Sequence, residues 1–344
     1  MAPPVVSTQV QLVARPVGWP TADDFRTTRI ELPEVGPGQV RVVNEFISVD
    51  PYMRGRMNDA KSYAAPYALG ETMTGGAVGR VVRSATDAFA VGDVVVHQLG
   101  WRDIAQGDAA GFRAVPEMDG VPLSANLGVL GMTAFTAYVG LREVAHLAPG
   151  DVVFVSGAAG AVGTMVGQIA RLSGAGRVIG SAGSAAKVAL LRDRYGFDAA
   201  FDYRDGDLAG QLAAAAPDGI DVYFDNVGGA HLEAAIGALR PGGRAALCGA
   251  ISQYNDVEAP VGPRNLSNLV TRGLTLKGFT VGGYTQHFPA FAAEMAAWLA
   301  AGDVVYDETV VTGIENSVDA FLALMHGANT GKMVVRTSGA DGPV

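Results

Sequence analysis

Cysteine and charged residues are scarce in this sequence of 344 residues, and no cluster of histidines takes their place. The single cysteine, Cys248, excludes a disulfide framework within the chain and any zinc site that needs several cysteines. The five histidines lie far apart and never four residues from one another, at positions 97, 146, 231, 287 and 326. Because a catalytic metal needs about three protein ligands close together, we expect no bound metal and no metal catalysis.

Charged residues make up only 17% of the sequence, and the formal net charge is −9. No tract of basic residues is present, which argues against nucleic acid or an acidic membrane surface as a partner. No apolar run is long enough to span a bilayer, and the first residues lack the basic and long apolar regions of a signal peptide. We therefore expect a soluble cytoplasmic protein.

A glycine-rich turn stands near the middle of the chain, between an apolar strand and a helix. Val152–Val155 has the character of a buried parallel strand, and apolar residues recur at helical spacing over 161–171. The turn between them holds Gly157, Gly160 and Gly163. In dinucleotide-binding folds such a turn lets the backbone and the helix N-terminus approach a pyrophosphate. We predict a dinucleotide site here; the alternative is a tight turn that only packs a helix on a sheet.

The two sides of this turn differ in character. The first part of the chain has short alternating strands separated by glycine, proline and aspartate, at 9–15, 25–32, 39–49, 75–82, 93–98 and 111–115. With a loop at 50–56, this pattern predicts an all-β first domain. After residue 126, a helix is expected over 127–146, and apolar strands then alternate with helical segments, which is typical of a doubly wound parallel sheet. The expected segments include strands at 199–202 and 220–225 and a helix at 288–301. We therefore expect an α/β protein with a β-rich domain at 1–126, a Rossmann domain at 127–307, and a tail at 308–344 that returns to the first domain.

The choice of nicotinamide cofactor depends on the end of the strand that follows the glycine turn. An NAD site usually carries an acid about 20 residues past the glycines, where it binds the ribose 2′-hydroxyl. The corresponding segment, 180–187, contains no acid. Ser181, Gly183 and Lys187 favour a 2′-phosphate instead, since lysine meets that anion as a point charge. This predicts NADP(H); the alternative is that Lys187 is a solvated lysine on the first turn of a helix.

Five motifs occur in a characteristic order: 49–54 (VDPYMR), 157–163 (GAAGAVG), 224–229 (FDNVGG), 248–255 (CGAISQYN) and 327–332 (GANTGK). Together they resemble the zinc-free medium-chain dehydrogenase/reductase group, within it the prostaglandin/leukotriene reductases, the plant alkenal double-bond reductases and the bacterial curcumin-reductase-like proteins. The resemblance covers residues 9 to 336. It implies a GroES-like first domain and NADPH-dependent reduction of the C=C bond of α,β-unsaturated ketones and aldehydes, by hydride transfer to the β-carbon.

The resemblance also implies which residues contact the cofactor, although Asn226 has the alternative role of an Asx turn at a strand end. The glycine turn and first helical turn would contribute Gly160, Ala161, Val162, Gly163 and Thr164. The phosphate region would contain Ser181, Gly183, Lys187, Tyr203 and Asn329. The later strand ends would contribute Asn226, Cys248, Gly249, Ala250, Ile251, Ser252, Phe279, Thr280 and Val281.

Two tyrosines are the candidate catalytic residues. Charge that develops on a carbonyl oxygen is stabilised by placed hydrogen-bond donors, and the resemblance offers Tyr254 beside the nicotinamide and Tyr52 in the first domain. Both have the alternative role of amphipathic packing. Proton return to the α-carbon is left to solvent or to a tyrosine. Candidate substrate contacts are Leu99, Gly100, Trp101 and Tyr284, and the segment 282–284 departs from the relatives' pattern.

Two alternative functions and a homodimeric assembly are also considered. The first rival is an NADPH-dependent quinone reductase on the same scaffold, and the second is a cofactor-binding sensor without activity. The segments 50–54 and 252–255 favour the alkene reductase over the quinone reductase. The relatives form dimers, and the apolar segment 274–281, expected as a late strand of the sheet, is a candidate to pair across a two-fold axis in a homodimer.

Overall fold

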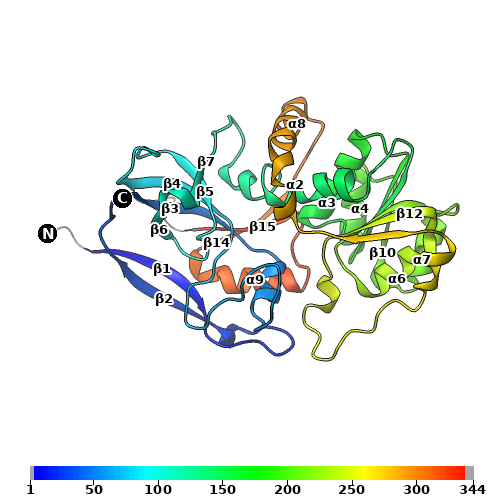
Figure 1. Ribbon diagram of the computed structural model, residues 1–344, viewed down its shortest axis with the longest axis horizontal. Helices are drawn as coiled ribbons and strands as arrows, with labels where there is room; N and C mark the ends of the chain where they lie inside the picture. Colours follow the sequence, from blue (N-terminus) through cyan, green and yellow to red (C-terminus); the bar gives the residue numbers. More distant parts are fainter. Residues whose placement is uncertain (1–3, 338–344) are drawn as a thin grey trace. The chain divides into compact units, whose positions relative to one another are not determined.

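The computed structural model of the protein describes residues 4–337. Backbone contacts divide the chain into two compact units. Unit 1 comprises Met1–Gly128 and Glu308–Val344, and unit 2 comprises Val129–Asp307. In Figure 1, which is coloured along the sequence, unit 1 includes the blue and cyan strands and the red C-terminal segment. Each unit is described by itself below.

Unit 1 is built mainly on antiparallel strands. A two-stranded sheet pairs β1 (Val5–Leu12) with β2 (Phe25–Leu32). A seven-stranded sheet runs in the order β14-β15-β3-β4-β5-β7, with β6 paired to β3. Its strands are β3 (Gln39–Ser48), β4 (Ala77–Ser84), β5 (Val94–His97), β6 (Ile104–Asp108), β7 (Phe112–Ala114), β14 (Glu308–Thr312) and β15 (Lys332–Arg336). Since β15 pairs with β3, residues from both ends of the chain share one sheet.

The pairing of β3 with β4 is irregular, and the sheet to which they belong has buried clusters on both faces. The register shifts at Arg41/Val42 and again at Asn44/Phe46. A Cβ atom at Gly79 would lie 2.1 Å from the Val43 carbonyl oxygen, so only glycine fits there. The two buried clusters are Val40, Val42, Val81, Val95 and Phe112 on one side, and Phe46, Val78, Val94, Val115, Leu123, Leu127 and Val334 on the other.

Unit 1 also contains short helices, so the expectation of an all-β first domain was too simple. The segment expected as a loop after β3 contains α1 (Tyr52–Arg56), which follows Pro51 with its φ of −60°. Proline fixes φ near the helical value and is well tolerated at the start of a helix. The remaining elements are α9 (Ser317–Met325) and the 3₁₀ turns η1 (Ala22–Asp24), η2 (Ala109–Gly111), η3 (Leu123–Leu127) and η8 (Ile314–Asn316).

Unit 2 is a parallel six-stranded sheet in the order β10-β9-β8-β11-β12-β13. Counted from β8, this is the 3-2-1-4-5-6 order of the Rossmann fold, so the predicted fold class is confirmed. The strands are β8 (Val152–Val155), β9 (Arg177–Ala182), β10 (Ala199–Asp202), β11 (Ile220–Asp225), β12 (Leu239–Leu247) and β13 (Thr275–Gly278). The chain reverses its direction across the sheet between β8 and β11, which is where this fold binds ligands.

Helices accompany this sheet, and none of those in residues 4–337 is long and apolar enough to cross a membrane. They are α2 (Met132–Val139), α3 (Ala161–Leu172), α4 (Ala185–Asp193), α5 (Leu208–Ala215), α6 (Gly229–Ala238), α7 (Ser267–Thr271) and α8 (Phe288–Ala301). A π-helical turn, η4 (Gly140–Val144), and the 3₁₀ turns η5 (Tyr203–Asp205), η6 (Ile251–Gln253) and η7 (Val281–His287) complete the unit. The sheet's core includes Phe154, whose ring stacks on Tyr223 with the centroids 5.2 Å apart.

Two elements of unit 2 differ from the sequence-based expectation. The helix expected over 127–146 is shorter and passes into the π-helical turn at Gly140. A Cβ atom at Gly140 would lie 2.4 Å from the Phe224 ring, so the helix approaches the sheet closely at this glycine. The strand expected over 274–281 is limited to Thr275–Gly278, and the chain then turns into η7. The ladder stops there because Gly278 pairs with Leu247, which is the last residue of β12.

Candidate cofactor and substrate site

The glycine turn of unit 2 is shaped to bring α3 close to β8. Gly157 has a φ of +59°, a conformation that favours glycine. Gly160 is the N-cap of α3, and its carbonyl accepts the first helical bond from the Thr164 N–H at 3.0 Å. A Cβ atom at Gly163 would lie 2.5 Å from the Gly157 carbonyl oxygen. This leaves the first N–H groups of a twelve-residue helix at the carboxyl end of β8, where they can bind an anion.

The carboxyl end of β9 supplies the next part of the site. The backbone carbonyl of Ser181 accepts a hydrogen bond from the Ala158 N–H at 2.9 Å, and this bond joins β9 to the glycine turn. The Ser181 hydroxyl is fully buried and has no hydrogen-bond partner within the described part of the chain. A Cβ atom at Gly183 would lie 3.0 Å from the Tyr203 hydroxyl and 3.2 Å from Arg204 Nε, so both side chains close over this glycine.

Two cations lie together at this point. Ser184 caps α4 by accepting from the Lys187 N–H at 3.3 Å, which places Lys187 in the first helical turn. The pKa of Lys187 is lowered, first by burial and then by the positive charge of Arg204. An anion bound between the two cations would offset their mutual repulsion and the cost of burying the Lys187 charge. The donor set therefore fits the 2′-phosphate of NADP, and Arg204 is a candidate ligand that the sequence reasoning missed.

Polar side chains join β8 to β11 at the switch point of the sheet. Asp225 is buried, and its Oδ1 accepts from the Tyr223 hydroxyl at 2.7 Å and from the Val227 N–H at 2.9 Å. The Asx turn weighed for Asn226 therefore belongs to Asp225. Asn226 donates from Nδ2 to the Ser156 carbonyl at 2.8 Å, so its side-chain oxygen is the atom left to meet a ligand. A contact of Asn226 with the cofactor stays a prediction.

The segment after β12 holds the first candidate catalytic tyrosine. The N–H groups of Cys248 and Gly249 donate to the Asp225 carbonyl at 2.9 and 3.0 Å, which fixes the segment beside the end of β11. The Tyr254 hydroxyl accepts from the Ala250 N–H at 3.3 Å. Burial, with a smaller effect of the Asp225 charge, raises the pKa of Cys248 to about 12. This thiol is therefore not ionised, and it has no thiolate character for nucleophilic chemistry.

Two further candidate residues of unit 2 lie against each other. The Phe279 ring meets the Tyr284 ring edge to face at 6.2 Å, and it meets Phe224 of β11 in the same way at 6.1 Å. Thr280 is the N-cap of η7, and Val281 begins that turn. These residues form an aromatic surface next to the carboxyl end of β11. Whether they bind the cofactor or the substrate stays a prediction.

The second candidate tyrosine, Tyr52, opens α1 in unit 1. Burial raises its pKa well above the usual range, and the charge of Asp50 adds to the effect. Its phenol therefore stays protonated and can donate a hydrogen bond. The preceding residues are held by Lys332, whose Nζ lies 3.0 Å from Asp50 Oδ1 and 3.0 Å from the Val49 carbonyl oxygen. A buried ion pair thus fixes the start of α1.

The predicted substrate segment 99–101 lies in the interior of unit 1. Trp101 is fully buried, and its ring packs on Phe25 and Phe321 with centroids 6.3 and 6.2 Å away. A Cβ atom at Gly100 would lie 2.9 Å from the Gly75 carbonyl oxygen. The Leu99 N–H donates to His97 Nδ1 at 3.0 Å. These contacts give the segment a packing role, and a contact with substrate stays a prediction.

Asn329, the remaining predicted cofactor residue, belongs to unit 1. Asn329 is buried and donates from Nδ2 to the Gly331 carbonyl at 2.8 Å.

Among residues 4–337, no group of three or more His, Cys, Asp or Glu side chains is arranged to hold a metal ion. Burial lowers the pKa of His97 to about 3, with a smaller effect of Arg102, so this imidazole is a neutral structural group.

Comparisons with known proteins agree with the predicted family. A family profile described as the N-terminal domain of oxidoreductase matches residues 8–115, and one described as zinc-binding dehydrogenase matches residues 161–298. The chain is 41% identical to the NADP⁺-dependent 2-alkenal reductase of Nicotiana tabacum over 346 residues, covering 98% of this chain and 99% of the relative. It is 38% identical to the NADPH-dependent curcumin reductase of Escherichia coli over 335 residues, covering 96% of each.

A solved structure gives the same result in three dimensions. The crystal structure of CurA from Vibrio vulnificus in complex with NADPH superposes with a TM-score of 0.91 at 43% sequence identity. The match covers 96% of this chain and 99% of that one. The resemblance inferred from the five motifs is thereby confirmed. The chain belongs to the medium-chain dehydrogenase/reductase family of NADP-dependent oxidoreductases, with the curcumin, 2-alkenal and prostaglandin reductases.

Proposed function

We propose that this enzyme uses NADPH to reduce the C=C bond of α,β-unsaturated ketones and aldehydes. The observation that carries the proposal is Arg204 lying against Gly183 beside the glycine turn, with its charge acting on Lys187, in a chain whose relatives are curcumin and 2-alkenal reductases. The pair suits a phosphorylated ribose. The relatives' activities suggest a conjugated carbonyl compound as the substrate.

The chain's own residues have separate tasks in this reaction. Bound NADPH supplies a hydride to the β-carbon of the substrate. The N–H groups at the start of α3 bind the pyrophosphate, and Lys187 with Arg204 hold the 2′-phosphate. Tyr254 donates a hydrogen bond to the carbonyl oxygen as negative charge develops there, and Tyr52 is the second candidate donor. The α-carbon then takes a proton from solvent or from one of these tyrosines.

The rival function is quinone reduction on the same scaffold. It would need the same cofactor residues, but the product would be a hydroquinone instead of a saturated carbonyl compound. The test is NADPH consumption, followed by its absorbance, with a panel of aliphatic enones and alkenals and a matched panel of quinones. Turnover of the enones with a higher kcat/KM than the quinones supports the proposal. Preference for quinones would replace it, and a flat trace with every compound would favour a cofactor-binding sensor.

We also propose that the enzyme is a homodimer that pairs through β13. This strand ends the sheet order, and three of its four residues are exposed. An unpaired sheet edge offers its N–H and C=O groups to another chain. The residues before β13 add exposed apolar side chains, namely Val257, Val261, Leu266 and Val270. A second copy related by a two-fold axis would cover both features.

A further inference from the structure

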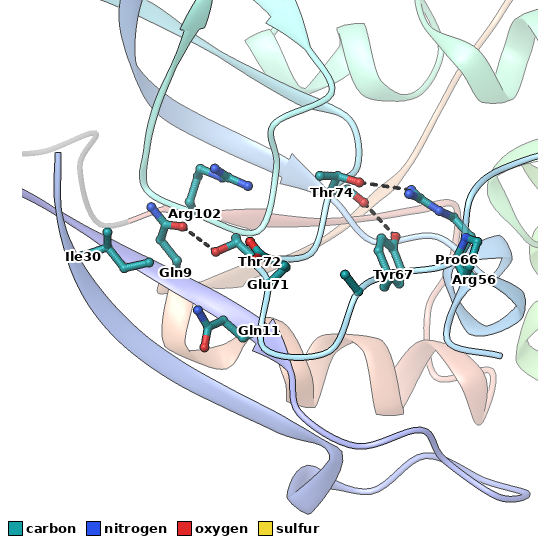
Figure 2. A pocket seen from close by; sticks show the side chains of 11 residues that line it. Gln9, Gln11, Ile30, Arg56, Pro66, Tyr67, Glu71, Thr72, Thr74 and Arg102 are labelled. Atoms are coloured by element: carbon teal, nitrogen blue, oxygen red, sulfur yellow. Dashed lines mark hydrogen bonds between the residues drawn. The ribbon is translucent and has the colours of Figure 1, made fainter. Parts of the chain in front are cut away.

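Unit 1 contains a cavity of about 430 Å³ that the proposed reaction does not use. β1, the segment 66–74, Arg56 of α1 and Arg102 line it, and all of them belong to unit 1. Its volume falls in the range of small-molecule sites, which runs from about 300 to 1,000 Å³. Figure 2 shows Gln9 and Thr72 facing each other in this cavity, with Arg102 beside them and Gln11 further along β1. The polar atoms that these side chains present indicate what the cavity can bind.

The carboxamide oxygens of the two buried glutamines are both engaged. Gln11 Oε1 accepts from Arg26 at 2.9 Å, and because arginine is only a donor, this contact fixes the orientation of the Gln11 amide. Gln9 Oε1 accepts from the Thr72 hydroxyl. Among the described residues, neither amide nitrogen donates to a protein acceptor, and neither is shut off from solvent. Each glutamine therefore contributes an NH₂ donor to the cavity that is left to bind a ligand.

Arg102 adds a positive charge without a paired carboxylate. The one hydrogen bond of its guanidinium within the described chain is a long one, from Nε to the Gly100 carbonyl at 3.4 Å. The neighbouring Asp103 is occupied elsewhere, since its Oδ1 accepts from the Ser7 hydroxyl and the Thr8 N–H. Burial lowers the pKa of Arg102 to about 10, and no carboxylate offsets this effect. A half-buried guanidinium without a carboxylate partner gains from an anion that pairs with it.

The other two charged groups that line the cavity, Arg56 and Glu71, leave its interior positively charged. Arg56 stacks on the Tyr67 ring at 4.0 Å and donates to the Thr74 hydroxyl at 3.1 Å, so it forms a fixed positive wall. Glu71 is the one acid that lines the cavity, and its side chain is exposed to solvent. The interior thus combines a guanidinium and two amide donors, while the acid faces water.

We propose that this cavity binds a small oxyanion, a carboxylate or phosphate group, held by Arg102 and by the amide nitrogens of Gln9 and Gln11. The planar guanidinium matches a two-oxygen anion with two parallel hydrogen bonds. The proposal is independent of the reductase activity, because its residues all differ from those assigned to cofactor and substrate. It assigns a ligand site to unit 1.

Isothermal titration of the holoenzyme tests this proposal. The enzyme is saturated with NADPH in a low-chloride buffer, so that the cofactor fills the phosphate site at Lys187, and is titrated with inorganic phosphate and, separately, with succinate. Arg102→Met should raise the dissociation constant at least about 10-fold, as expected for the loss of a charge-assisted hydrogen bond. Gln11→Glu keeps the contact with Arg26 but adds a negative charge to the cavity, so it should weaken binding to a similar extent.

Arg83→Met is the matched control, because it removes the same charge from an exposed position of unit 1. Its dissociation constant should stay that of the parent enzyme. Retained NADPH binding and an unchanged circular dichroism spectrum show that each variant is folded, and Gln11→Glu provides the test if Arg102→Met is not. The anion that binds more tightly identifies the ligand class. Absence of binding by both anions, or binding that survives in both cavity variants, would overturn the proposal.

Discussion

Replacing Lys332 by methionine removes the cation from a buried ion pair in unit 1. The side chains of Lys332 and Asp50 are 4% and 5% exposed, and Nζ lies 3.0 Å from Asp50 Oδ1. Nζ also donates to the carbonyl oxygens of Val49 and Met333 at 3.0 and 2.9 Å. The substitution would leave Asp50 buried with Ser48 as its hydrogen-bonding neighbour. Removing one partner of a buried pair costs about 3–5 kcal/mol, and we expect a loss of this size.

The double variant Asp50→Asn/Lys332→Met separates two contributions: the loss of the Lys332–Asp50 ion pair, and the cost of leaving the Asp50 carboxylate buried without a cation. Since a neutral amide is cheaper to bury than an unpaired carboxylate, the double variant should recover at least about 1 kcal/mol relative to Lys332→Met. Lys61→Met, at an exposed position of the same unit, is the control and should stay within about 0.5 kcal/mol of the parent.

Denaturant unfolding in a Trp298→Phe background measures these differences, because the remaining tryptophans, Trp19 and Trp101, both lie in unit 1. Lys332→Met and the double variant should also lower kcat, since Asp50 precedes the helix that begins at Tyr52. Parent-like stability of Lys332→Met would refute the reasoning. So would a double variant that is no more stable than the single one.

The other predictions concern the cofactor, the chemistry and the assembly. Lys187→Ala should weaken NADPH binding by about 1.5–3 kcal/mol and leave NADH nearly unchanged, and equal losses in a fluorescence titration would move Lys187 out of the phosphate site. Tyr254→Phe should lower kcat roughly 10- to 1000-fold with little change in NADPH affinity. A parent-like rate there, with Tyr52→Phe crippled, would assign the donor role to Tyr52. Light scattering at micromolar protein should give twice the chain mass of 35.4 kDa, and a monomer would exclude pairing through β13.

Much of the fold followed from local patterns. The bounds of β2, β10, β11 and α8 agree with the expected segments, because strong apolar periodicity and flanking turn residues mark them. β6 was not predicted: its sequence, IAQGD, has little alternation, and its pairing with β3 is a contact distant in the sequence. Residues 52–56 were expected as loop because five residues carry too little periodicity to indicate a helix.

In the candidate site too, residues in one local segment could be predicted from the sequence, whereas residues that only folding brings together could not. The glycine turn and Lys187 stand in one local segment and could be proposed as site residues from their spacing. Arg204 follows β10, which is adjacent to β9 only in the folded sheet, although the rule that parallel strand ends meet at one edge could have pointed to it. The donors of the unit 1 cavity come together through isolated bridges between Gln9 and Arg102 and between Gln11 and Thr72. No sequence pattern indicates such contacts.

Isotope transfer tests the central claim most directly. The enzyme is given an enone and NADPH that carries deuterium at the transferable position of its nicotinamide ring, and the product is analysed by NMR and mass spectrometry. The account predicts a saturated ketone with deuterium on the β-carbon and hydrogen from solvent on the α-carbon. An allylic alcohol with deuterium on the former carbonyl carbon, or a product without deuterium, would contradict it.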